Sequence, residues 1–143
     1  TMDEAESVTI LIVDDDAVDV RAIKRALVAR RILNPIRVAA DGIFALEMLR
    51  GEGGQARVER PYLILLDVNM PRMNGLDFLA ELRADADLMD SVVFILTTSD
   101  RDEDRVRAHD LQAAGYIIKS LVGEELVHLV GLLSHCEQAV ELP

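Results

Sequence analysis

The feature that most constrains the fold is an alternation of short apolar runs with longer stretches that have a helical pattern. The five runs are Thr9–Val13, Ile36–Ala39, Tyr62–Leu66, Val92–Leu96 and Gly115–Ile118. Runs of this length are typical of buried strands. Strands that alternate with helices predict a parallel sheet, and right-handed crossovers place helices on both of its faces. We therefore expect an α/β domain with a doubly wound, five-stranded parallel sheet.

The segments between the runs carry apolar residues at helical spacing and have recognisable ends. Asp41 can cap a helix, because an aspartate side chain accepts hydrogen bonds from the free N–H groups of a first turn. We expect five helices. The first ends at about Arg31, the second runs from Asp41 to the glycine-rich loop 51–54, and the third starts after Gly75. The fourth runs from Asp100 to about Leu111 and the fifth from Gly123 to about Glu141.

Length and composition fit one globular domain. The chain has 143 residues, half of them apolar, and no apolar run approaches the ~20 residues of a membrane span. The net charge of −11 argues against binding nucleic acid, which needs a basic surface. A single cysteine, Cys136, fits a reducing cytoplasm. We expect a single domain over 1–143, with a tail at 1–7, the last helix and a tail at 120–143, and no output domain.

Polar residues follow four of the five runs and predict the chemistry. Asp14 and Asp15 follow the first run, Asp67 the third, Thr97 the fourth and Lys119 the fifth. The carboxyl ends of parallel strands meet at one edge of a sheet, where open α/β folds bind their ligands. Crowded carboxylates need a cation, and an all-oxygen donor set favours Mg²⁺ or Mn²⁺. With a hydroxyl and an ammonium beside them, they suit phosphoryl transfer to an aspartate.

Each of these residues has an ordinary explanation when taken alone. An Asp-Asp pair at a strand end is often a turn or a helix cap, and a lone lysine is usually solvated. The signal is their joint occurrence in order, each at the end of its own strand. The three histidines, His109, His128 and His135, lie in helical stretches, and no pattern links them.

With these motifs the chain resembles the receiver domains of two-component response regulators over nearly its whole length. Asp14-Asp15 matches the acidic pair of the family, Asp67 its phosphoacceptor, Thr97 its switch hydroxyl and Lys119 its invariant lysine. Met70-Pro71 and Asn74-Gly75 match the loop after the phosphoacceptor. The resemblance implies a flavodoxin-like sheet in the receiver order 2-1-3-4-5.

The resemblance also implies roles for individual residues. Asp15 and Asp67 would bind Mg²⁺ through their side chains and Asn69 through its backbone carbonyl, with Asp14 acting mainly through water. Tyr116 stands where the family keeps an aromatic that rotates when the switch operates. Asn69, Thr98 and Ser99 stand where the phosphoryl lifetime is tuned. Such a protein catalyses its own phosphorylation and dephosphorylation, and no turnover of a separate substrate is expected.

Two departures from the common receiver pattern bear on the subfamily. Ser120 follows Lys119 where most receivers have a proline after a cis peptide bond, so the isomer is open here. Thr98 is larger than the residue usual after the switch hydroxyl. Together with the glycine-rich insertion and the extended carboxyl end, these features are similar to the single-domain regulators that partner phytochrome-type histidine kinases.

The resemblance implies a sensor histidine kinase as partner, and the apolar last helix suggests a second contact. Its core-facing stripe falls at positions 126, 129, 130 and 133, while Val122, Val127 and Leu132 fall partly outside it. This surplus predicts a homodimer through the C-terminal region, against the alternative of a broad core stripe with scattered exposed leucines.

Other functions remain open at this point. A chemotaxis-type receiver or a phosphorelay intermediate would carry the same residues. A receiver that has lost its chemistry and only binds partners would be expected to lack some of them. A phosphatase of the haloacid dehalogenase type needs a second aspartate two positions after the nucleophile, and Asn69 stands there.

Overall fold

The computed structural model of the protein describes residues 8–68, 73–97 and 111–129. The elements in chain order are β1 (Thr9–Val13), α2 (Ala17–Ala29), β2 (Ile36–Ala39), α3 (Gly42–Arg50), β3 (Tyr62–Asp67), α4 (Gly75–Ala84), β4 (Val92–Thr97), β5 (Gly115–Ile118) and the short 3₁₀ helix η1 (Lys119–Leu121). Residues 122–129 are helical. The helix expected from Asp100 to about Leu111 lies almost wholly outside the described residues.

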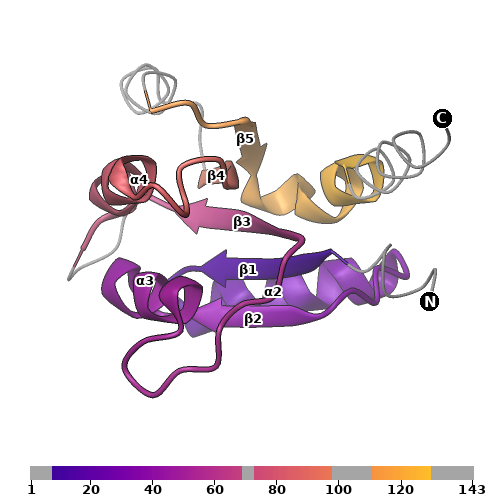
Figure 1. The fold of residues 1–143 in the computed structure, drawn as a ribbon. Coiled ribbons are helices and arrows are strands. Elements are labelled where there is room, and N and C mark those ends of the chain that lie inside the picture. The colour runs from indigo at the N-terminus through magenta and orange to yellow at the C-terminus, as the bar shows by residue number, and fades with distance from the viewer. Residues whose placement is uncertain (1–7, 69–72, 98–110, 130–143) are drawn as a thin grey trace, which may run out of the picture.

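The five strands form one parallel sheet in the order β2-β1-β3-β4-β5 (Figure 1). This confirms the predicted doubly wound architecture and its strand order. The predicted bounds of β1, β2 and β5 are those observed, while β3 and β4 each extend one residue further, to Asp67 and Thr97. Two of the predicted site residues are therefore the last residues of their strands.

The sheet is covered on both faces, and each face has its own apolar core. Alternate residues of a strand point to opposite faces, so Leu11 and Val13 pack with α3 and α4 while Ile10 and Ile12 pack with α2. The final helix joins α2 on the second face through Val122 and Leu126. Within the described part of the chain, no helix is long and apolar enough to cross a membrane.

The helices begin at capping side chains that the sequence supplies. The Asp16 carboxylate accepts hydrogen bonds from the backbone N–H groups of Val18 and Asp19 at the start of α2. Asp41 accepts one from Phe44 at 2.8 Å and caps α3, as predicted. At the other end of α3, Gly51 adopts the left-handed conformation with φ of 70°, which glycine reaches without a steric penalty.

The start of the final helix differs from the prediction. Lys119–Leu121 form a 3₁₀ turn, and the helix begins at residue 122 rather than at Gly123. The expectation that Val122 lies partly outside the core stripe is wrong, because this turn directs Val122 into the core beside Leu126. Val127 does lie outside the core and is 46 % exposed. Leu132, the third residue of the predicted surplus, lies outside the described residues, as do positions 130 and 133 of the predicted core stripe.

Candidate functional site

The predicted site residues meet at the carboxyl edge of the sheet. Asp14 follows β1, Asp67 ends β3, Thr97 ends β4 and Lys119 follows β5. The register pairs Val13 with Leu66, Asp67 with Leu96 and Thr97 with Ile118. Because β1, β3, β4 and β5 are neighbours in the sheet, the four residues stand on adjacent strands at one edge, as the sequence predicted.

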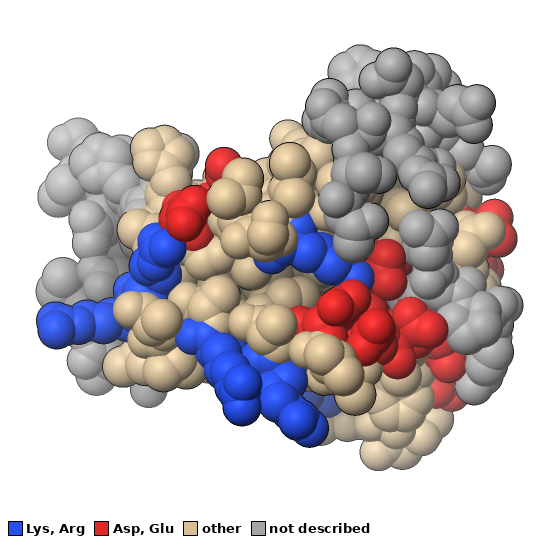
Figure 2. Space-filling model, turned by 180° about the vertical axis from the view of Figure 1, so that it is seen from behind, with Lys and Arg blue, Asp and Glu red and all other residues tan. Residues whose placement is uncertain are grey.

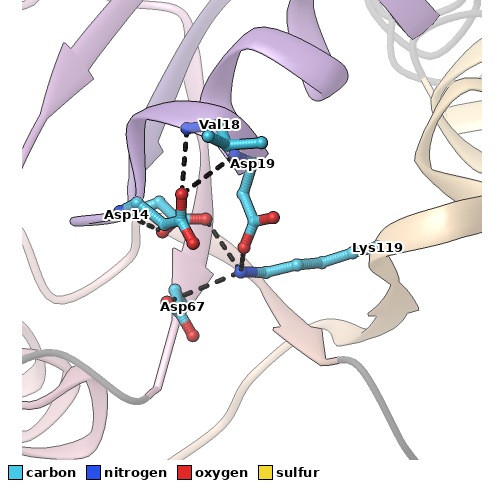
Figure 3. A network of polar contacts seen from close by, with 6 residues as sticks. Asp14, Val18, Asp19, Asp67 and Lys119 are labelled. Atoms are coloured by element: carbon cyan, nitrogen blue, oxygen red, sulfur yellow. Dashed lines mark hydrogen bonds and ion pairs between the residues drawn. The ribbon is translucent and has the colours of Figure 1, made fainter.

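The Lys119 ammonium lies among carboxylates from three parts of the chain (Figure 3). Its Nζ atom is 3.0 Å from Oδ2 of Asp14 and 3.6 Å from Oδ2 of Asp67. It also donates a hydrogen bond of 2.7 Å to Oδ2 of Asp19, in the first turn of α2. Asp14 and Asp67 are buried, and only 14 % of the Lys119 side chain is exposed.

These contacts keep the lysine charged. Burial alone lowers the pKa of the Lys119 ammonium, because it disfavours the charged form. A hydrogen bond to Asp19 and the negative charges of Asp14 and Asp67 oppose burial and prevail, so the pKa is raised above its ordinary value. Lys119 therefore presents a positive charge to Asp67 at neutral pH.

The acidic residues offer a donor set that fits a hard divalent cation. Carboxylate oxygens of Asp14, Asp15 and Asp67 lie within 4.8 Å of one another. Oδ2 of Asp14 is buried and has no hydrogen-bond partner among the described residues, although the Lys119 charge lies 3.0 Å away. The site thus combines an available buried oxygen of Asp14 with the exposed carboxylate of Asp15 and the buried carboxylate of Asp67. This set suits Mg²⁺ or Mn²⁺, which prefer oxygen ligands and retain waters.

The backbone behind Asp67 is held by the start of α4. The Gly75 N–H donates a hydrogen bond of 3.1 Å to the carbonyl of Val68. A Cβ at this position would lie 2.5 Å from the Cα of Val68 and would also collide with the carbonyl oxygen of Asp67. The glycine after Asn74 is thus required by the close approach of α4 to the end of β3.

The predicted switch residues occupy adjacent strands. Thr97 and Tyr116 are both half-buried, and Tyr116 packs against the core on the α3–α4 face of the sheet. Asn69, Thr98 and Ser99, assigned to metal binding or lifetime tuning, lie outside the described residues. Among the described peptide bonds, the cis isomer occurs before Pro61, and Lys119–Ser120 is trans.

Asp19 is the site residue that sequence reasoning missed. It belongs to a helix rather than to a strand end, so a search along strand ends does not reach it. One signal was available: Asp19 stands in the first turn of the helix that directly follows the acidic pair, and so close to the same edge of the sheet. Whether its side chain meets Lys119 depends on how α2 packs against the sheet.

The surface around the site is divided by charge. Seen from the side opposite to Figure 1, most acidic side chains gather toward one side of the molecule, although some acidic and basic side chains adjoin one another (Figure 2). On α2 the same division follows the chain: Asp15 and Asp16 are exposed at its start, and Arg21, Lys24 and Arg25 are exposed further along. A hollow of about 490 Å³ is lined by acidic, apolar and basic residues, among them Asp15, Val20, Val38 and Lys24.

The fold and the edge of carboxylates, hydroxyl and lysine are those of a receiver domain, and comparison with known proteins agrees. Residues 10–131 match the response regulator receiver domain family, and the chain belongs to that family. It is 33 % identical over 135 residues to the response regulator Rcp1 of Synechocystis, an alignment that covers 94 % of this chain and 92 % of Rcp1.

Solved structures show the same likeness. A two-component response regulator from Legionella pneumophila superposes with a TM-score of 0.77 at 35 % identity, covering 87 % of this chain and 98 % of that one. The phosphorylated cyanobacterial phytochrome response regulator RcpA gives 0.73 at 33 % identity, covering 93 % and 95 %. The Mn²⁺-bound form of Rcp1 gives 0.70 at 32 % identity, covering 86 % and 88 %. The chain is thus a receiver domain similar to phytochrome response regulators.

Proposed function

We propose that Asp67 accepts a phosphoryl group from a phosphohistidine of a sensor histidine kinase and that this modification switches a protein-interaction surface. The observation that supports this most directly is the Lys119 ammonium, 3.6 Å from Oδ2 of Asp67 at an edge that also holds Asp14 and Asp15. An aspartate beside a fixed positive charge is suited to receive a group whose oxygens carry negative charge.

The transfer is a displacement at phosphorus. An oxygen of Asp67 forms the new P–O bond while the P–N bond to the kinase imidazole breaks, and the leaving nitrogen takes the bonding electron pair. Lys119 balances charge on the phosphoryl oxygens, and the Thr97 hydroxyl donates a hydrogen bond to one of them. Asp15, Asp67 and the Asn69 carbonyl would hold Mg²⁺ or Mn²⁺, with Asp14 acting mainly through water, and the cation would supply further neutralisation.

The output of the switch is a change in packing around β4 and β5. When Thr97 moves toward the phosphoryl group, Tyr116 fills the vacated space, which repacks the neighbouring surface and shifts the population between two states. Hydrolysis of the acyl phosphate returns the protein to the first state. Asn69, Thr98 and Ser99 are the positions proposed to set how long the phosphorylated state lasts.

Phosphorylation with a small donor tests the central step. Incubation with acetyl phosphate and Mg²⁺ is expected to raise the intact mass of the wild type by about 80 Da, the mass of one phosphoryl group. Asp67→Asn should gain nothing. Asp87→Asn, which makes the same change at an exposed position, should behave as the wild type. Equal labelling of Asp67→Asn would show that Asp67 is not the acceptor.

Two further measurements separate the rival functions: turnover of small phosphate esters and binding of Mg²⁺. Continuous release of phosphate from small phosphate esters, with no lasting mass increase, would favour a phosphatase of the haloacid dehalogenase type. Failure to bind Mg²⁺ would favour a receiver that only binds partners. A chemotaxis-type receiver and a phosphorelay intermediate would pass both tests, and the identity of the phosphodonor and target distinguishes them.

We infer a phytochrome-type histidine kinase as the partner, since both Rcp1 and RcpA are similar over most of the chain and RcpA is described as a phytochrome response regulator. Phosphotransfer profiling against candidate kinases tests this: the cognate kinase should label Asp67 well before the others. We place the phosphotransfer in the cytoplasm. The net charge of −11 argues against nucleic acid as a target, because nucleic acid is bound by basic surfaces.

We also propose a homodimer formed through the C-terminal region. The exposed Leu121 and Val127, 41 % and 46 % exposed, belong to this region and face away from the core. Sedimentation at micromolar concentration, before and after phosphorylation, is expected to give the mass of two chains. A protein that remains monomeric in both states would remove the dimer from this proposal.

A further inference from the structure

The closest partner of Lys119 is not the phosphoacceptor. Its Nζ atom lies 2.7 Å from Asp19, 3.0 Å from Asp14 and 3.6 Å from Asp67. Figure 3 shows the Asp19 carboxylate reaching down from α2 to the end of the lysine side chain. The ammonium thus contacts three carboxylates, and its distance to Asp67 is the longest of the three.

Asp19 differs from the other carboxylates in where it stands. Its side chain is 36 % exposed, against 0 % for Asp14 and 10 % for Asp67. Its backbone N–H bonds to the Asp16 cap, which places Asp19 in the first turn of α2, where a helix favours negative charge. Water and the helix end can therefore keep this carboxylate stable after its contact with Lys119 is broken. The buried Asp14 has no such alternative.

We propose that Asp19 is a positioning residue that draws Lys119 away from Asp67 in the resting protein and releases it when a phosphoryl group arrives. This inference rests on the proposed function. A phosphoryl group on Asp67 brings additional charged oxygens toward the ammonium. A lysine ammonium is a compact charge on a flexible stem, so it can exchange one oxygen partner for another within the same pocket. Asp19 then competes with the phosphoryl group for a single cation.

Competition predicts that removing Asp19 speeds phosphorylation. The test measures the rate at which acetyl phosphate and Mg²⁺ label Asp67, by intact mass and peptide mapping. Because partly exposed ion pairs are weak, we expect Asp19→Asn to react about two- to fivefold faster than the wild type. Asp19→Ser replaces the carboxylate by a smaller, uncharged side chain and should react as fast as Asp19→Asn. Asp19→Glu keeps a carboxylate at this position and should react at close to the wild-type rate.

A matched control separates this contact from a general effect of charge. Asp16→Asn removes one negative charge from the same end of α2 and keeps the cap, because asparagine caps helices as well as aspartate. It should stay close to the wild-type rate. If Asp16→Asn accelerates the reaction as much as Asp19→Asn, the effect is one of net charge and the proposal is wrong.

The remaining outcomes are equally decisive. An Asp19→Asn rate equal to or below that of the wild type overturns the proposal, because Asp19 would then have no effect on Lys119 or would hold it in a productive position. A wild type that acquires no phosphoryl group on Asp67 overturns the proposed function itself, and the two failures are thereby distinguished.

Discussion

At the scale of single residues, the site is a set of charges that do not balance. Among the described residues, the Lys119 ammonium is the cation in contact with Asp14, Asp19 and Asp67, and Asp15 adds a further carboxylate nearby. Like charges at such distances repel, and a functional site can retain repulsion that a purely structural one would lose. The stability of the protein without metal should therefore increase when one of these charges is removed.

Asp67→Asn tests this expectation. The change removes repulsion from Asp14 and Asp15, while Lys119 keeps its two closer partners. We expect the free energy of unfolding, measured by urea titration in EDTA, to rise by about 1 kcal/mol. In saturating Mg²⁺ the advantage should disappear, since the wild type then gains more from the cation. A loss of stability in EDTA would mean that the attraction between Asp67 and Lys119 outweighs the repulsion.

Gly75 is a second residue whose replacement has a defined consequence. A methyl group there would collide with the backbone of Asp67 and Val68, which cannot yield as a flexible side chain does. Gly75→Ala should lower the free energy of unfolding by about 1–3 kcal/mol, the usual cost of overpacking, and should slow phosphorylation of Asp67. Glu81→Ala, at an exposed position of the same helix, is the control and should remain within about 0.5 kcal/mol of the wild type. A fully stable Gly75→Ala would show that the loop can move aside.

At the scale of elements, the apolar runs were enough to predict the strands, and the strands were enough to bring Asp67 and Lys119 together. Parallel strands end at a common edge whatever the details of their packing, so this part of the site follows from chain order. The contact of Asp19 with Lys119 could not be predicted from the strand pattern, because it depends on the rotation and distance of α2 relative to the sheet. The burial of Val122 was missed for a related reason: a 3₁₀ turn shifts the start of the final helix.

The junction between α3 and α4 allows a prediction about pH. Asp85 ends α4, and its carboxylate accepts a hydrogen bond of 3.0 Å from Arg50 at the end of α3. The backbone N–H of Asp87 lowers the pKa of Asp85 most, and Arg50 lowers it further. A carboxyl group with a lowered pKa contributes stability above its unfolded value, about 3.9, and loses it as the pH falls through the folded value.

Carboxyl NMR titration should thus place the pKa of Asp85 below its ordinary value. Arg50→Ala should raise that pKa only part of the way, because the Asp87 N–H remains. Arg57→Ala removes an exposed arginine elsewhere and should leave the Asp85 titration unchanged. A complete return to the ordinary value in Arg50→Ala would mean that the ion pair, rather than the backbone hydrogen bond, dominates.

At the scale of the whole molecule, the proposed metal site would couple metal binding to folding. The two faces of the sheet are held by separate apolar cores, yet the strand ends that carry Asp14 and Asp67 belong to the shared central sheet. Because β1 and β3 are paired, strand ends kept in register are needed to bring the two carboxylates together. A cation that binds these carboxylates in the folded chain, and binds the unfolded chain far less, stabilises the entire domain by mass action.

Mg²⁺ should therefore raise the melting temperature of the wild type in a concentration-dependent way. At 100 times its dissociation constant, a ligand specific for the folded state adds about 2.7 kcal/mol of stability. Asp15→Asn removes a proposed ligand that the structure leaves exposed and outside the Lys119 contacts, so it should fold normally and lose most of this response. Asp87→Asn, an equal charge change far from the edge, should keep it. If both variants responded to Mg²⁺ as the wild type does, the cation would be acting on the net charge of −11 and not at the acidic edge of the sheet.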